Sequence, residues 1–161
     1  MFNFFKKKND NKKLVAYAKG KFIPITDVPD PIFSEKMMGD GVAILVKGDT
    51  IYAPCDGTII LVANTLHAVG ISSATGVEIL IHIGFDTVNL NGKGFTKLIN
   101  QGDKVKKGTP LIKIDRKIME EEKIDLTTPM VVTNSADYNI SIINEEKDVT
   151  TDEEVISCAK K

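Results

Sequence analysis

Apolar and polar residues alternate over short stretches along most of this chain, and glycine or proline separates one stretch from the next. From Leu14 onward, runs rich in Ile and Val recur between turn residues, a pattern typical of β-strands. Residues 27–40 contain three proline or glycine breaks and predict a loop with at most one turn of helix. The pattern therefore predicts an all-β protein, an antiparallel β-sandwich or flattened barrel with one or two short helices.

Two segments have helical character. Residues 94–101 predict one or two helical turns. Residues 115–123 predict a short helix in which Asp115 is the N-cap and Ile118 and Met119 face inward.

A weak internal repeat accompanies the strand pattern. The segment Val15–Ile23 resembles Tyr52–Ile60, with an alanine, a four-residue step to glycine and then a strand in each. This spacing predicts two related β units packed together. No linker rich in Pro and Ser divides the chain, so residues 14–161 are predicted to form one domain and residues 1–13 a flexible N-terminal leader.

The stretch Thr65–Val88 contains the only two histidines of the chain, His67 and His82. Both of its flanks predict strands, and Ser73–Gly76 is the turn signal, so we expect a β-hairpin. A loop of even length pairs His67 directly with His82 and places the two rings side by side on one face. A loop of odd length would shift this register by one residue and separate the rings.

The expected register also divides the hairpin into two faces. Val77, Ile79, Ile81 and Ile83 would point into a core, because side chains alternate along a strand. Val69, Ile71 and Leu80 would share the other face with the histidines. The prediction is an apolar patch with a histidine pair at one end.

Composition narrows the classes of function. The net charge of −1 argues against nucleic-acid binding, and no apolar run is long enough to cross a bilayer. Cys55 and Cys158 have no metal-binding or CxxC spacing, so we expect unpaired, inert thiols in a reducing, cytoplasmic environment. The leader Met1–Lys13 lacks the order of a signal peptide; it predicts a disordered segment or a short amphipathic one that contacts an anionic membrane surface.

Several motifs occur together in one order. They are DPIFSEKMMGDG at 30–41, APCDG at 53–57, HA at 67–68, LIHIGFDTV at 80–88, LNGKGF at 90–95 and GDKVKKG at 102–108. Together they resemble the glucose-family enzyme IIA of the bacterial phosphoenolpyruvate-dependent sugar phosphotransferase system, over roughly residues 15–132. The resemblance implies an antiparallel β-sandwich with a duplicated motif. The chain departs from the family pattern at Ala16-Tyr17, where Ala-Pro is usual, and at Asp152–Glu154, where a glycine turn is usual.

The resemblance implies that His82 carries the phosphoryl group. The residue types agree with this role, because a neutral imidazole is a good nucleophile near neutral pH. A backbone carbonyl just past His82, that of Gly84, is a candidate to orient its ring. His67 would then stabilise the phosphoryl oxygens, and the Thr65 hydroxyl would hold the His67 tautomer.

The resemblance also implies partners. The donor would be the histidine-containing phosphocarrier protein, and the acceptor a cysteine of a sugar-specific enzyme IIB of a IIB/IIC permease. Asp30 and Asp86 would flank the histidines and meet incoming proteins. Partner contacts are further predicted at the apolar patch, which comprises Val69, Ile71 and Leu80 with Phe33 and Met38 as its extension.

Other functions remain open on the sequence. A zinc peptidase of similar β architecture needs three protein ligands, and this chain supplies two histidines and no HxH motif. No cofactor is required, although zinc could bridge His67 and His82 if a partner or a carboxylate supplied further ligands. A module that binds and regulates transporters or enzymes in its unphosphorylated state is compatible with phosphoryl carriage. A biotinyl- or lipoyl-type carrier shares the Gly-x-x-Val-x-x-Gly spacing, but no motif for lysine modification occurs at a hairpin tip.

Overall fold

Antiparallel strands dominate the computed structural model, which describes residues 11–143 and 147–161. The eight-stranded sheet contains, in spatial order, β10 (Lys104–Val105), β6 (Gly57–Val62), β7 (Ala68–Ser73), β8 (Glu78–His82), β12 (Thr127–Val132), β4 (Asp40–Val46), β3 (Gly20–Pro24) and β14 (Asp148–Val149). One three-stranded sheet contains β5 (Thr50–Tyr52), β11 (Pro110–Ile114) and β9 (Phe95–Lys97). The other contains β13 (Tyr138–Ile142), β15 (Glu154–Lys160) and β2 (Asn11–Val15). The helical elements are η1 (Ile25–Asp27), α2 (Pro31–Ser34), η2 (Thr87–Leu90), α3 (Arg116–Glu121) and η3 (Ser135–Asp137).

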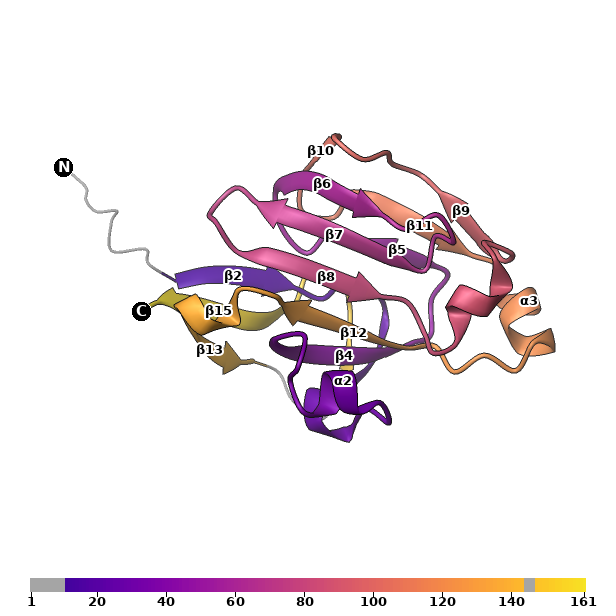
Figure 1. Ribbon diagram of the computed structural model, residues 1–161, viewed down its shortest axis with the longest axis horizontal. Coiled ribbons are helices and arrows are strands. Elements are labelled where there is room, and N and C mark those ends of the chain that lie inside the picture. Colours follow the sequence, from indigo (N-terminus) through magenta and orange to yellow (C-terminus); the bar gives the residue numbers. More distant parts are fainter. Residues whose placement is uncertain (1–10, 144–146) are drawn as a thin grey trace.

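The sheets form a sandwich, as the alternation of apolar residues predicts. Figure 1 shows β6, β7, β8, β12 and β4 side by side in front, with β5 and β11 behind β6 and β7. One continuous core joins these layers, and Ile59, Ile71, Ile51 and Ile112 are each fully buried in it. Over the described residues the sheets stay open at their edges and do not close into a barrel.

The internal repeat appears as an approximate two-fold symmetry of the large sheet. The two repeats supply β3 and β6, each second from an edge of the sheet, and the centre lies between β8 and β12. The repeats also meet directly, because the Val15 amide donates to the Pro54 carbonyl at 3.0 Å and the Tyr52 amide donates to the Tyr17 carbonyl at 2.8 Å. The predicted packing of two related β units is therefore confirmed.

One of the two predicted helices is present. α3 begins after Asp115, whose carboxylate accepts from the amides of Lys117 at 3.1 Å and Ile118 at 3.3 Å, as an N-cap does. Met119 is buried and Ile118 partly so, as predicted. The loop at residues 27–40 contains only the single turn α2, also as predicted.

The predicted helical turns at residues 94–101 are wrong. Phe95–Lys97 instead forms strand β9, which pairs with β11. Gly92 and Gly94 have φ values of 88° and 87°, which are incompatible with a right-handed helix at these positions. The side chain of Phe95 is buried, so the tertiary contact with β11 decides the conformation.

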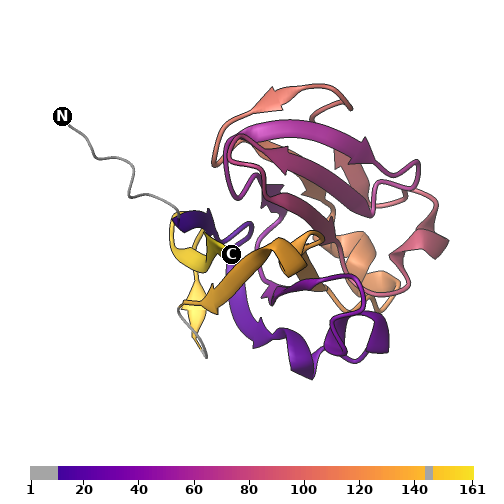
Figure 2. The ribbon, with the colours of Figure 1, turned by 60° about the vertical axis from the view of Figure 1, so that its left-hand side comes forward.

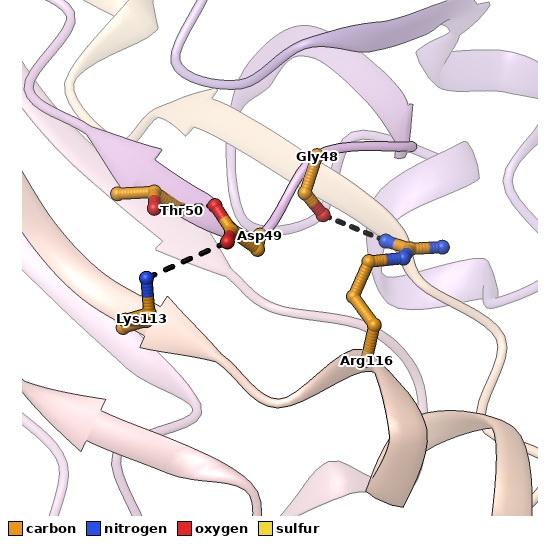
Figure 3. A network of polar contacts seen from close by, with 5 residues as sticks. All are labelled: Gly48, Asp49, Thr50, Lys113 and Arg116. Carbon is orange, nitrogen blue, oxygen red and sulfur yellow. Dashed lines mark hydrogen bonds and ion pairs between the residues drawn. The ribbon is translucent and has the colours of Figure 1, made fainter.

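Polar contacts join α3 to the turn between β4 and β5. The guanidinium of Arg116 donates to the carbonyl oxygen of Gly48 at 2.7 Å (Figure 3). It also donates to the carbonyl oxygen of Val46 at 3.2 Å. Beside it, Lys113 lies 3.5 Å from Asp49, whose other carboxylate oxygen accepts from the Thr50 hydroxyl (Figure 3). This network stabilises an edge of the sandwich.

Three residues of the predicted leader, Asn11, Lys12 and Lys13, instead belong to strand β2, which pairs with β15. Figure 2 shows this strand beside the yellow C-terminal strand. The predicted membrane contact of Met1–Lys13 falls mostly on residues 1–10, which lie outside the described residues. Within residues 11–143 and 147–161, no helix has the length and apolar character needed to span a membrane.

Both cysteines are free thiols. Burial raises the pKa of Cys55 to about 12 and that of Cys158 to about 11. Each thiol therefore stays protonated at neutral pH, which agrees with the prediction that both are inert.

Tyr17 provides a test of the packing of the first repeat against β12. Its side chain is fully buried, and its hydroxyl donates to the Thr128 carbonyl at 2.6 Å. Tyr17→Phe should lower the free energy of unfolding by about 1–3 kcal/mol, because it leaves a buried carbonyl short of a donor. Urea denaturation measures this loss.

Tyr138→Phe is the matched control, because Tyr138 is also buried but its hydroxyl makes no recorded hydrogen bond among the described residues. Equal effects of the two substitutions would contradict the importance of the Tyr17 bond.

Candidate functional site

The β7–β8 hairpin forms as predicted, but its register differs by one residue. Ala68 pairs with His82, Gly70 with Leu80, and Ser72 with Glu78. The expected register would have paired His67 with His82. The connecting loop is therefore odd in length, the condition under which the two rings were expected to separate.

The Ser73 side chain explains the odd loop. Its hydroxyl oxygen accepts from the amides of Val77 at 2.8 Å and Thr75 at 3.2 Å. Gly76 completes the turn with a φ of 99°, a conformation that favours glycine. Hydrogen bonds from backbone amides to a nearby serine hydroxyl are common in turns. The pattern of apolar residues does not predict them.

The register reverses the face of β7. Val69 and Ile71 now pair with Ile81 and Ile79 and have no exposed surface, so they belong to the core. Their predicted role in partner binding is therefore wrong. The expectation for Val77, Ile79, Ile81 and Ile83 is confirmed, since each is buried in the same core.

The two histidine rings nevertheless lie side by side. Their centroids are 5.1 Å apart and the ring planes meet at 79°. Regular alternation would turn His67 away from His82, but β7 begins only at Ala68, and Leu66 has a left-handed φ of 61°. The left-handed conformation of Leu66 turns the His67 side chain toward His82. The backbone pairing of the two strands still extends to His67, because the Ile83 amide donates to its carbonyl at 2.7 Å. The predicted proximity of the two rings is confirmed, but the direct pairing of His67 with His82 that was predicted to produce it is wrong.

Backbone and ring contacts orient His82. Its Nδ1 lies 3.0 Å from the Gly84 carbonyl oxygen, which can only accept, so Nδ1 carries the proton and Nε2 has the free lone pair. The Phe33 ring packs against the imidazole with a centroid distance of 5.3 Å. The carbonyl sets the tautomer and Phe33 limits rotation of the ring.

Thr65 is in hydrogen-bonding contact with His67 through Oγ1 and Nδ1, which is the contact expected from the sequence. Both residues are half-buried. The Nε2 atom of His67 makes no recorded hydrogen bond within the described residues, so this nitrogen is available to a bound group.

The carboxylates and apolar side chains around the pair differ in exposure. Asp30 is half-buried and caps α2 by accepting from the Ile32 amide, whereas Asp86 is exposed and precedes η2. Phe33 is only 4% exposed, so it supports the surface from below and is not itself a partner contact. Leu80 is half-buried, and Met38 is exposed.

Three further exposed apolar residues were not predicted as partner contacts from the sequence. Ile32 and Met37 flank Phe33 and are 45% and 70% exposed, and Val88 on η2 is 48% exposed. Ile32 and Met37 lie within the quoted motif, where apolar residues around a short helical turn are a usable signal. Val88 carries no such signal, because a strand and a 3₁₀ turn look alike over four residues.

Comparison with known proteins identifies the family. Residues 12–138 match the family described as phosphoenolpyruvate-dependent sugar phosphotransferase system, EIIA 1. The chain belongs to this family. The structure is also similar to glucose permease IIA from Mycoplasma capricolum, with a TM-score of 0.84 and 34% sequence identity over 98% of this chain and 99% of that chain. As an EIIA, the chain is a phosphotransferase component with a role in sugar phosphotransfer.

The electrostatics of this EIIA favour neutral histidines. Burial lowers the pKa of His82, and the Gly84 carbonyl and Asp30 act in the opposite direction. Burial and the neighbouring His82 ring both lower the pKa of His67. The net direction is downward for both, so the uncharged rings are favoured at neutral pH.

The site offers few ligands to a metal ion. Within residues 11–143 and 147–161, no group of three or more His, Cys, Asp or Glu side chains is placed to hold one. The histidine pair supplies two nitrogens, one fewer than a peptidase zinc centre takes from its protein. Zinc bound between His67 and His82 would need ligands in addition to these two nitrogens.

The pH dependence of this EIIA follows from the two lowered pKa values. Both histidines should titrate below about 6.5, the value for an exposed imidazole. In that range the unfolded chain binds more protons than the folded one, so the free energy of unfolding should fall as the pH drops below about 6.5 toward the folded pKa values. NMR titration of the ring protons and urea denaturation at several pH values measure both effects.

A His67→Gln/His82→Gln double variant is the control, and it should lose this part of the pH dependence. A ring that titrates above the exposed value would contradict the expected direction.

Proposed function

We propose that this EIIA carries a phosphoryl group on His82 during sugar uptake. It accepts the group from the histidine-containing phosphocarrier protein and passes it to a cysteine of a sugar-specific enzyme IIB. The observation that carries the proposal is the bond from His82 Nδ1 to the Gly84 carbonyl, 3.0 Å long, beside a second imidazole. It leaves Nε2 as the nucleophile, on a half-buried ring that partners can reach.

The chemistry requires no proton transfer by the protein. The lone pair of Nε2 forms a bond to phosphorus as the nitrogen–phosphorus bond of the donor phosphohistidine breaks. In the second step the IIB thiolate forms a phosphorus–sulfur bond, and the electron pair returns to Nε2. Phosphoryl transfer depends mainly on in-line positioning and neutralisation of charge, and the Nδ1–H bond to Gly84 supplies the positioning.

His67 has the role of stabilising the phosphoryl oxygens. Its ring lies within 5.1 Å of the His82 ring, centroid to centroid, so a phosphoryl group on Nε2 of His82 comes within reach of its Nε2–H. Thr65 supports this role when its hydroxyl donates to Nδ1 of His67, because the ring proton then resides on Nε2. Donors aimed at the transferring oxygens are a large source of stabilisation in such sites.

The exposed apolar residues around the pair form the docking surface. This surface comprises the exposed residues Ile32, Met37, Met38 and Val88 and the half-buried Leu80. They belong to the α2 segment, whose Phe33 contacts the His82 ring, and to the chain on either side of His82. Exposed apolar side chains next to a reactive group suit transient protein partners, which must bind, exchange a phosphoryl group and leave. Asp30, whose charge acts on His82, and Asp86 would contribute charge that the two partners meet.

Substitution of each histidine tests the roles separately. His82→Ala should abolish phosphorylation, because it removes the nucleophile. His67→Ala should still accept the group but transfer it onward more slowly, by about 10²–10³-fold, because it removes one donor to the phosphoryl oxygens. Incubation with the upstream components, followed by mass spectrometry and a IIB acceptor assay, measures both steps.

Phosphate found on His67 or on an aspartate would overturn the assignment to His82. The control is His67→Gln, whose side-chain amide retains a donor and should recover part of the onward transfer.

A charge placed on the docking surface tests partner binding. Met37→Lys should raise the KM for the phosphorylated donor by about tenfold, because interface positions of this kind contribute about 1–2 kcal/mol. The thermal stability should not change, since Met37 is 70% exposed. Steady-state phosphorylation at several donor concentrations measures the effect.

Leu98→Lys is the matched control for this experiment. Leu98 is also an exposed apolar residue, at 46%, but it follows β9 and its amide bonds to β11 in a different sheet. A similar rise in KM for both variants would point to a general effect of charge and not to docking.

A further inference from the structure

The Ile83–Gly84 peptide group next to His82 is held at both ends by buried hydroxyls. The Thr87 hydroxyl donates to the Ile83 carbonyl at 2.5 Å, and the Gly84 amide donates to Thr128 Oγ1 at 3.2 Å. Neither threonine has any exposed surface. A buried hydroxyl costs free energy unless it is bonded, so these two groups are committed to their partners.

The following peptide group is the one that orients the ring. Its carbonyl, that of Gly84, accepts from His82 Nδ1 at 3.0 Å, and its amide, that of Phe85, donates to the Asp125 carbonyl at 3.0 Å. The direction of the Gly84 carbonyl is therefore set by the plane of the peptide before it and by the segment that ends in β12.

Little space remains for this backbone to relax. Gly84 has a left-handed φ of 67°, and a Cβ added there would lie 2.9 Å from the Asp125 carbonyl oxygen and 3.0 Å from the Thr87 methyl group. Thr128 is itself fixed, because its hydroxyl donates to the Leu126 carbonyl at 2.9 Å and its carbonyl accepts from Tyr17. The chain of contacts thus runs from the first repeat through β12 to the imidazole.

We propose that Thr128 and Thr87 are positioning residues for phosphoryl transfer, which act by holding the peptide that aims the Gly84 carbonyl at His82 Nδ1. They touch neither the phosphoryl group nor the partner. They act by keeping the ring in the tautomer and orientation that present Nε2. This inference rests on the proposed role of His82 as the nucleophile, and nothing in the quoted motifs assigns a function to Thr128.

The test replaces each threonine with an isosteric residue that lacks the hydroxyl. Thr128→Val and Thr87→Val should lower kcat for phosphorylation roughly 10- to 100-fold, because a small misplacement of a reacting group has effects of that size. The KM for the phosphorylated donor should not change, because the docking surface is untouched. Nitrogen NMR of histidine-labelled protein should show that the Nδ1–H tautomer of His82 loses its dominance.

Two controls separate positioning from loss of stability. Thr128→Ser keeps the hydroxyl and should restore both the tautomer and kcat. Thr50→Val removes a buried hydroxyl on β5 in another sheet, one that donates to the Asp49 carboxylate at 2.9 Å, and should leave the His82 tautomer as it is. Thermal denaturation of every variant establishes that the comparison is made on folded protein.

The outcomes are distinguishable. If Thr128→Val and Thr87→Val keep both the tautomer and kcat, or if Thr128→Ser is as impaired as Thr128→Val, the threonines do not position the ring and the inference is overturned. If the unmodified protein takes up phosphate at a residue other than His82, the proposed function fails, while the NMR measurement still decides whether the threonines set the tautomer.

Discussion

The position of β8 between β7 and β12 is the constraint on which the histidine site depends. Backbone ladders on both sides hold β8, with Ala68 opposite His82 on one side and Val131 opposite Leu80 on the other. Ile79 and Ile81 are anchored in the core, so the strand can neither slide nor rotate without exposing them. His82 is the last residue of this strand, so the backbone from which its ring projects is fixed at the border between core and solvent.

The chemistry at this border reflects a balance between burial and access. A ring inside the core would be neutral but unreachable, whereas a fully exposed ring would have an ordinary pKa and a mobile orientation. His82 is half-buried, Phe33 packs on one side of it, and the pKa of the ring is lowered mainly by desolvation. Exposed apolar residues occur on α2 and η2, whereas the threonines that bond to the Ile83–Gly84 peptide group are fully buried.

The approximate two-fold symmetry of the sheet does not extend to the histidine pair. Leu80 and Val131 face each other across the centre, and the residues that pair with them on the outer side are Gly70 and Gly41. By this correspondence the position equivalent to His82 is Thr133. The duplicated frame therefore gives two similar halves, and the histidine pair occurs in only one of them.

Much of the fold can be read from the sequence because it depends on local patterns. Alternating apolar residues and regular glycines indicate an all-β sandwich, the alanine-to-glycine step marks the repeat, and Asp115 identifies the start of α3. Residues 94–101 were misread because the burial of Phe95 against β11 outweighs a weak local preference. Contacts between residues distant in the chain decide such cases.

The sequence by itself determined which residue types the site contains: two histidines, a threonine before the first and a glycine after the second. Only the tertiary structure decided how they meet. The Ser73 turn makes the hairpin loop odd, which buries Val69 and Ile71, and the left-handed kink at Leu66 brings the His67 ring back beside His82. The physical reason is that strand register follows hydrogen bonding in the turn, and side-chain direction follows backbone dihedrals, and neither is visible in the order of apolar and polar residues.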